Sequence, residues 1–351
     1  MKSLQEYINE SESKTDLSTN KVQPKTKDEL KEIIKDTFEH KQYDLNFINT
    51  SEITDMSKLF MSCDYNFDVS SWDVSNVTNM SQMFYFCVNF NCDLSGWDVS
   101  NVKNMYQIFY GCIRLNTDLS IWNVSNVTNM NHMFFACENF DIKCFESWDV
   151  SNVTDMNHMF YDCDNFNCDL SKWNVSKVVN MFSTFSSCKK FKGKGLENWD
   201  VSAVTDMHYM FYECENLNCD LSDWDVSNVT NMWHLFDGCK KLDCDLSDWK
   251  VYKVTDMSYM FNNCEQFNCD LSRWNVSKVK DMTSMFAGCK NFNCNLSRWN
   301  MSKVRNISYM FYNCTSFKGE GLYMWDVSNI DDAIKTFKGC DKDIIPSWYK
   351  N

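Results

Sequence analysis

The stretch NCDLSDWDVSNVTNM, residues 218–232, recurs along the chain with few changes. Close copies are NCDLSGWDVSNVKNM at 91–105, NCDLSKWNVSKVVNM at 167–181 and NCDLSRWNVSKVKDM at 268–282. Eleven tryptophans follow one another at intervals of 25 or 26 residues: Trp72, Trp97, Trp122, Trp148, Trp173, Trp199, Trp224, Trp249, Trp274, Trp299 and Trp325. Ile48 holds the same position one unit earlier, so we count about twelve units over residues 41–340. A fixed period in the twenties is typical of a solenoid, whose units are stable only when stacked.

The residues after each tryptophan predict a short helix. Every unit has Asn or Asp seven residues after the tryptophan position, Phe twelve after it and Cys fifteen after it. In one unit, the residues spaced to share a helical face are Val229, Met232, Leu235, Phe236 and Cys239. Asn231 stands where an N-cap belongs. Two helical turns are unstable alone, so we expect stacking to hold them.

The residues before each tryptophan predict a strand. In residues 267–272, FNCDLS, apolar and polar side chains alternate with period two. We therefore expect an α/β, leucine-rich-repeat-like solenoid, in which each unit has one short parallel strand and one short helix. Three units are one residue longer, and two of these contain KGKG (192–195) or KGEG (318–321), where glycine suggests a bulge.

The ends differ from the repeats, as solenoid ends must. Residues 1–27 are polar, and we expect them to be disordered. Residues 28–40 have helical spacing and are predicted to cap the first unit. At the other end, residues 341–351 are predicted to form a C-terminal cap, in which Ile344, Ile345 and Trp348 plug the core.

Composition restricts the function. The net charge of −14 disfavours nucleic acid as a partner. The chain shows no apolar run long enough to span a membrane and no signal-peptide pattern at its start, so its nineteen cysteines are expected to be reduced thiols inside a cell or virion. It also has no nucleophile elbow, phosphate-binding glycine loop or H-E-x-x-H motif. We therefore expect no enzymatic activity, no cofactor and no small-molecule substrate.

The repeat WDVSNVTNMxxMFxxCxxFNCDLSxW resembles the BspA-like leucine-rich repeats, and more closely their 25-residue type, first described as a mycoplasmal domain of unknown function. The lead-in TKDELKEIIKDTFEHKQYDLNFINTSEITDMSKLF, residues 26–60, is also similar to that family's. The resemblance covers about residues 28–340. It implies a leucine-rich-repeat-like solenoid and, for many members, surface proteins linked to adhesion and protein binding. Because this chain shows no signal peptide or lipobox cysteine, the resemblance favours an intracellular or giant-virus member.

Two columns of recurring residues raise the question of metal binding. Stacking would align one carboxylate column: Asp93, Asp118, Asp169, Asp220, Asp245 and Asp270. Carboxylates about 5 Å apart repel, so these residues either form a solvated face with raised pKa values or bind Ca²⁺ in a cation-stabilised structural array at a surface or in a virion. The recurring cysteines include pairs such as Cys264 and Cys269, which lie on the apolar face and are more simply core residues than zinc ligands.

Function is expected where the units vary. The candidate binding face consists of Tyr85, Tyr110, Tyr161, Tyr209, Tyr212, Trp233, Arg273 and Arg298. Exposed aromatic residues serve as binding anchors, although neighbouring units could also pack them between each other. His132 and His158 share a position in adjacent units but lack a third ligand at fixed spacing, so surface roles are the simpler interpretation. The leading hypothesis is a non-enzymatic scaffold that binds an unidentified protein along one face of the solenoid.

Overall fold

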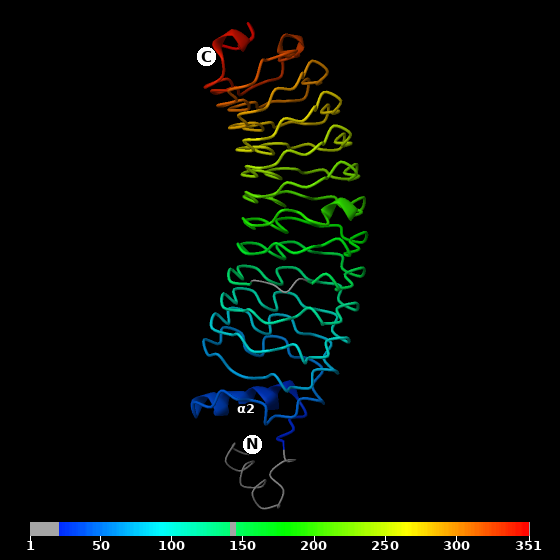
Figure 1. Cartoon of the computed structure of the whole chain (residues 1–351), viewed down its shortest axis with the longest axis vertical. Coiled ribbons are helices and arrows are strands. Elements are labelled where there is room, and N and C mark those ends of the chain that lie inside the picture. Colours follow the sequence, from blue (N-terminus) through cyan, green and yellow to red (C-terminus); the bar gives the residue numbers. More distant parts are fainter. Residues whose placement is uncertain (1–20, 141–144, 351) are drawn as a thin grey trace, which may run out of the picture.

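The computed structural model describes residues 21–140 and 145–350. The chain winds into a long, gently curved stack of coils, with helix α2 at one end and the C-terminus at the other (Figure 1). Each 25- or 26-residue unit makes one coil, so residues one period apart lie side by side. The predicted disorder of residues 1–27 falls mostly outside the described residues. Within them, Val22 pairs in parallel with Ile48 of the first coil.

The prediction of one strand and one helix per unit was wrong. Among the described residues, the α-helix is α2, Lys27–Glu39, and the remaining helical segments are three-residue 3₁₀ turns: η1 at Leu196–Asn198, η2 at Leu322–Met324 and η3 at Lys342–Ile344. The coils are joined by isolated parallel bridges instead of a ladder of strands. These bridges link the Asn or Asp of successive units, from Asp55–Asn79 through to Asn306–Asp332.

Consecutive turns replace the predicted helix. In the unit of Trp148, the amide of Met159 donates to the Met156 carbonyl at 3.1 Å, whereas the amide of Phe160 donates to Thr184 of the next coil at 2.9 Å. The amide of Tyr161 again bonds within the coil, to His158 at 3.2 Å. Alternate amides therefore bind within a coil and between coils, whereas an α-helix would use all of them internally.

Two positions in each unit adopt the left-handed backbone that this turn succession needs. In the unit of Trp148 they are His158, with φ 53°, and Asp162, with φ 58°. A residue with positive φ at the third position of a turn is typical of type II geometry. Glycine takes the second position in four units, namely Gly111, Gly238, Gly288 and Gly339.

The distance between coils explains why a helix is excluded. The phenylalanine rings of successive coils lie 5.5 to 5.8 Å apart, and Trp224 and Trp249 are 6.3 Å apart on the other side of the core. An α-helix with its side chains is about 10–12 Å wide, so one helix per coil would not fit this spacing. Stacked turns satisfy the hydrogen-bonding groups of the backbone at the observed spacing between coils.

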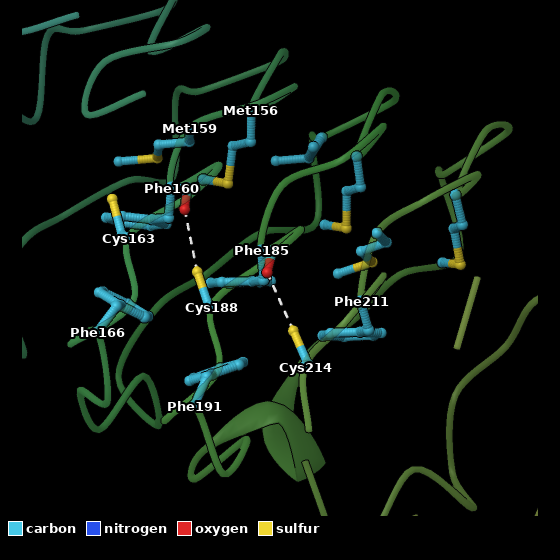
Figure 2. Packing of buried hydrophobic residues seen from close by; sticks show 14 of the residues in the cluster. Met156, Met159, Phe160, Cys163, Phe166, Phe185, Cys188, Phe191, Phe211 and Cys214 are labelled. Atoms are coloured by element: carbon cyan, nitrogen blue, oxygen red, sulfur yellow. Dashed lines mark hydrogen bonds between the residues drawn. The ribbon is translucent and has the colours of Figure 1, made fainter. Parts of the chain in front are cut away.

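Buried side chains repeat from coil to coil. Phe160, Phe185 and Phe211 form one row, flanked by methionines and cysteines (Figure 2). Every tryptophan at the repeat position donates its indole N–H to a carbonyl in the preceding coil, as Trp224 does to Leu196 at 2.8 Å. The indole groups therefore bury a large apolar surface without leaving a polar atom unpaired.

The two ends close the core differently. Thr26 caps the N-terminus of helix α2, because its hydroxyl accepts the Glu29 amide at 3.2 Å, and the helix buries Leu30, Ile33 and Ile34 against the first coil. At the other end, Trp348 donates to the Leu322 carbonyl at 3.0 Å and stacks on Trp325. Trp348 thus takes the tryptophan position of one further coil.

The glycines in the longer units make 3₁₀ turns rather than the expected bulge. Gly195, with φ 95°, precedes η1, and Gly321, with φ 85°, precedes η2. A Cβ at Gly195 would lie 2.1 Å from the Ser171 amide nitrogen of the preceding coil. The glycine therefore permits both the positive φ and the close approach of two backbones.

Candidate binding surface

The aspartate column is used by the fold. All six of its members accept the amide of the serine two residues later, for example Asp220 from Ser222 at 3.0 Å and Asp270 from Ser272 at 2.9 Å. These hydrogen bonds form Asx turns that precede each tryptophan. Within residues 21–140 and 145–350, no group of three or more His, Cys, Asp or Glu side chains is placed to hold a metal ion.

The pKa values of four of these aspartates shift in the opposite direction to the expectation. The pKa of Asp169 falls to about 2, because Lys194 and the Ser171 amide and hydroxyl bind its carboxylate. Hydrogen bonds from the following serine also lower the pKa of Asp220, Asp245 and Asp270. The expected raised pKa was therefore wrong for these four residues, because hydrogen bonds to the charged form outweigh repulsion along the column.

The complete cysteine column also has a structural role. The Cys188 thiol donates to the Phe160 carbonyl of the preceding coil at 3.0 Å, and the Cys214 thiol donates to Phe185 in the same way (Figure 2). Burial raises the pKa of Cys188 well above its usual range, so this thiol stays protonated. The described cysteines are all free. Cys144 lies outside the described residues.

We define the turn face as the surface formed by the side chains 9, 10 and 13 residues after the tryptophan position. Six of the eight candidate residues belong to it: Tyr85, Tyr110, Tyr161, Tyr209, Tyr212 and Trp233. At position 13, the ring centroids of Tyr85 and Tyr110 are 4.8 Å apart, and Phe135 continues the stack to Tyr161 at 4.5 Å. The ring planes therefore face each other along the stack of coils.

A second series of rings runs beside this stack. His132 and His158 are 4.3 Å apart, Phe182 contacts His158 at 4.3 Å, and His208 lies 3.8 Å from Phe182. Trp233 is 36% exposed and is the most exposed ring of the series. These aromatic residues therefore pack between units, as the alternative interpretation expected, and they also remain partly exposed to solvent.

Arg273 and Arg298 lie on a different surface from the tyrosines. Each precedes a buried tryptophan, whereas each tyrosine of position 13 follows a buried phenylalanine. Phe261 and Trp274 meet across the core at 6.2 Å. Their outward-pointing neighbours therefore lie on opposite sides of the coil. The two arginines line an open polar groove of about 600 Å³, together with Asn268, Asp270, Asn293 and Asn295.

The sequence interpretation overlooked one unit of the turn face. In the unit of Trp173, the residues at positions 10 and 13 are Ser183 and Ser186, where the neighbouring units carry aromatic or histidine side chains. Aligning the units column by column would have shown this substitution. Ser183 and Ser186 stand out only once the structure shows that the side chains of the neighbouring units stack on each other.

Comparison with known proteins identifies the family of this chain. The family described as Mycoplasma protein of unknown function, DUF285, matches residues 28–145, 136–249, 183–282 and 233–348. The chain belongs to this family. A search of curated proteins returns no match. Among solved structures, this DUF285 member aligns with the plant peptide hormone receptor RGFR1, solved in complex with RGF2, at 10% identity and a TM-score of 0.24, over 76% of this chain and 47% of the receptor chain. The chain thus spans about half of that receptor chain.

Among the described residues, none of the helices has the length and apolar character needed to cross a bilayer.

Proposed function

We propose that this protein is a non-enzymatic scaffold that binds a protein partner along the turn face, between Tyr85 and Tyr259. One observation carries the proposal: aromatic residues and histidines gather on this face in consecutive coils, although the turn does not need them. At position 9, Ser81 and Thr283 precede left-handed residues just as Tyr106 and Trp233 do. The aromatic residues therefore exceed what folding requires.

The chemistry of the face supports protein binding. Tyrosine and tryptophan are enriched in protein interfaces, because they combine a large apolar area with a polar edge and lose little conformational entropy. Stacking between coils fixes these rings before a partner arrives, which lowers the entropy cost of binding. The groove at Arg273 and Arg298 remains a second predicted contact region on the opposite side of the coils.

The cysteines support a reducing intracellular compartment. Eleven thiols donate to buried carbonyl oxygens in the described coils, and this arrangement requires the reduced form. A BspA-like relationship and a giant-virus origin stay predictions.

The test is affinity purification of the tagged full chain from its source cells, followed by quantitative mass spectrometry. We expect a specific partner with the wild-type chain and at least a tenfold loss of it for the variant Y209S/W233S. The matched control Y252S/Y323S changes two exposed tyrosines outside the turn face and should retain the partner. Melting curves of all three chains show whether each variant is folded. Equal recovery of every partner by all three chains would contradict the proposal.

A further inference from the structure

The groove beside Arg273 and Arg298 lies where the charge along one side of the coils changes sign. In the coils of Trp224 and Trp249, carboxylates occupy the positions four residues and one residue before each tryptophan: Asp220, Asp223, Asp245 and Asp248. In the next two coils the same positions hold Asp270, Arg273, Asn295 and Arg298. Four carboxylates give a formal charge of −4, whereas two arginines and one carboxylate give +1.

The fold does not require this change of charge. Asn295 accepts the Ser297 amide at 2.9 Å, just as Asp270 accepts the Ser272 amide at 2.9 Å, so an amide and a carboxylate serve the turn equally. The position before the tryptophan is exposed, whether it carries Asp or Arg. The two arginines therefore exceed what the coil needs, as the aromatic residues of the turn face do.

Both guanidinium groups are free to bind a ligand. Arg273 lies 3.5 Å from Asp248, and the two side chains are 69% and 79% exposed, so this ion pair is weak. Arg298 has no ion pair within residues 21–140 and 145–350. By comparison, the Lys194 ammonium lies 2.6 Å from the Asp169 carboxylate, which already neutralises it.

Two asparagines add neutral donors to the groove. The Asn268 side-chain oxygen accepts the Asn293 amide at 2.8 Å, and the Asn293 side-chain oxygen accepts the Lys318 amide at 3.0 Å. These bonds fix both carboxamides, whose NH₂ groups form no hydrogen bond in the part of the chain that the structure describes. Asn268 and Asn293 line the groove together with Arg273 and Arg298.

The remaining titratable groups of the lining leave it with a net positive charge. Burial raises the pKa of the Cys269 and Cys294 thiols to about 12, so both are neutral at physiological pH. Asp270 stays ionised, because hydrogen bonds from Ser272 lower its pKa, and the nearby Arg273 adds to this effect. Two arginines therefore face one carboxylate in a groove of about 600 Å³.

We propose that this groove binds the phosphoryl group of a phosphorylated serine or threonine on a protein partner, held between Arg273 and Arg298. The two arginines stand in adjacent coils, about 5 Å apart along the stack. A phosphoryl group has nearly two negative charges and three acceptor oxygens, which match two guanidinium forks and the Asn268 and Asn293 donors. A carboxylate, with one charge and two oxygens, would need only one arginine. The groove is open, so it also has room for the residues beside the phosphorylated one.

This inference rests on the second contact region of the proposed function and is tested with peptides of known sequence. The probe is a fluorescently labelled nonapeptide of glycine and alanine with one central phosphoserine, and its controls have serine or glutamate there. Fluorescence anisotropy measures binding of each peptide to the full chain at physiological salt. We expect the phosphoserine peptide to bind about tenfold more tightly than either control. Equal dissociation constants for the phosphoserine and glutamate peptides would overturn the inference.

Competition distinguishes a phosphorylated protein from free phosphate. Inorganic phosphate should displace the labelled peptide only at a concentration at least tenfold above that of the unlabelled phosphoserine peptide, because it lacks the flanking residues. Equal competition by inorganic phosphate would overturn the assignment to a protein partner.

The decisive variant is R298D, which introduces the residue that Asp223 and Asp248 provide at this position in earlier coils, so the coil should still fold. We expect it to weaken binding of the phosphoserine peptide about tenfold, to the level of the serine peptide. The matched control R114D makes the same change of charge at an exposed arginine outside the groove and should leave the dissociation constant unchanged. Unchanged affinity in R298D, or an equal loss in R114D, would overturn the proposal.

A second variant covers the case in which R298D does not fold. N295D keeps the shape of the groove and restores the carboxylate that the preceding coils carry, so affinity for the phosphoserine peptide should fall about fivefold. An unchanged affinity in N295D would also overturn the inference.

The two proposals fail separately. If the peptides show no preference for phosphoserine but Y209S/W233S still loses its cellular partner, the scaffold function stands and the phosphoryl site fails. If Y209S/W233S retains every partner while R298D loses the phosphoserine peptide, the turn face fails and the phosphoryl site stands.

Discussion

At the scale of single residues, the cysteine column shows how one side chain serves both packing and hydrogen bonding. The Phe160 carbonyl accepts the Cys163 amide at 3.2 Å within its coil and the Cys188 thiol at 3.0 Å from the next coil. Cysteine is small enough to fit between stacked phenylalanines and still provides a weak donor. Its recurrence therefore reflects the geometry of the coil and gives no indication of metal binding or redox activity.

Changing Cys188 to Ala should lower the free energy of unfolding by about 2 kcal/mol, because it leaves a cavity and removes a buried hydrogen bond. Changing it to Ser keeps a donor and should cost about half as much. Urea denaturation followed by tryptophan fluorescence measures both. If the Ala variant unfolds at the same urea concentration as the wild type, the thiol column contributes little to stability.

The stacked histidines predict a pH dependence of stability. Burial, with smaller contributions from His132 and His208, lowers the pKa of His158 to about 4. The unfolded chain therefore takes up a proton near pH 6.5, whereas folded His158 does so only near pH 4. Stability attributable to this group is present above pH 6.5 and is lost as pH falls towards 4.

Changing His158 to Gln should flatten the dependence of the melting temperature on pH between 6.5 and 4. The control is H40Q, since His40 is an exposed histidine just after α2. A steep decline that is identical in the wild type and H158Q would show that other groups govern acid unfolding. Below pH 4, protonation of Asp68 and Asp169, each with a pKa of about 2, should lower stability further in all three chains.

At the scale of elements, the succession of turns explains why the sequence pattern was misinterpreted. Apolar residues spaced three and four apart, such as Met232, Leu235, Phe236 and Cys239, are typical of a helix, and consecutive turns produce the same spacing. Asn231 does accept an amide two residues later, from Trp233 at 3.1 Å, as a cap would. The amides beyond it bond alternately to the next coil. The cap could thus be predicted, and the helix after it could not.

Gly195 provides a test of backbone fit at this scale. The variant G195A should lower the free energy of unfolding by more than about 2 kcal/mol, because its Cβ would meet the backbone of Ser171 and Leu170 at a positive φ. Gly96 is the matched control, because its Cβ would lie 3.9 Å from the nearest atom. G96A should change stability by less than about 1 kcal/mol. Thermal and urea unfolding measure both variants, and equal effects would contradict the steric argument.

At the scale of the whole molecule, contacts between neighbouring coils account for the shape and the stability. Each coil packs on the one before and the one after, so stability is close to a sum of local terms. The ends depend on dedicated closures, namely α2 at the first coil and Trp348 at the last. Loss of one closure should therefore destabilise only the few coils next to it.

Changing Trp348 to Ala should expose the last coils while leaving the middle of the chain intact. It removes the stack on Trp325 and the hydrogen bond to Leu322. Hydrogen exchange followed by mass spectrometry should show lost protection within about residues 300–350 and unchanged protection within 150–260. Uniform loss of protection along the chain would instead indicate a stack of coils that unfolds as one cooperative unit.

The sequence by itself determined the period, the number of units and the identity of the core columns, because these depend on apolar side chains that recur at fixed spacing. It also indicated the turn face, since Tyr85, Tyr110, Tyr161 and Trp233 vary where the core does not. Only the tertiary structure decided the backbone of each unit. The choice between a helix and a chain of turns depends on how closely the coils approach, and that distance is set by contacts between residues about 25 positions apart. The same contacts separate Arg273 and Arg298 from the tyrosines.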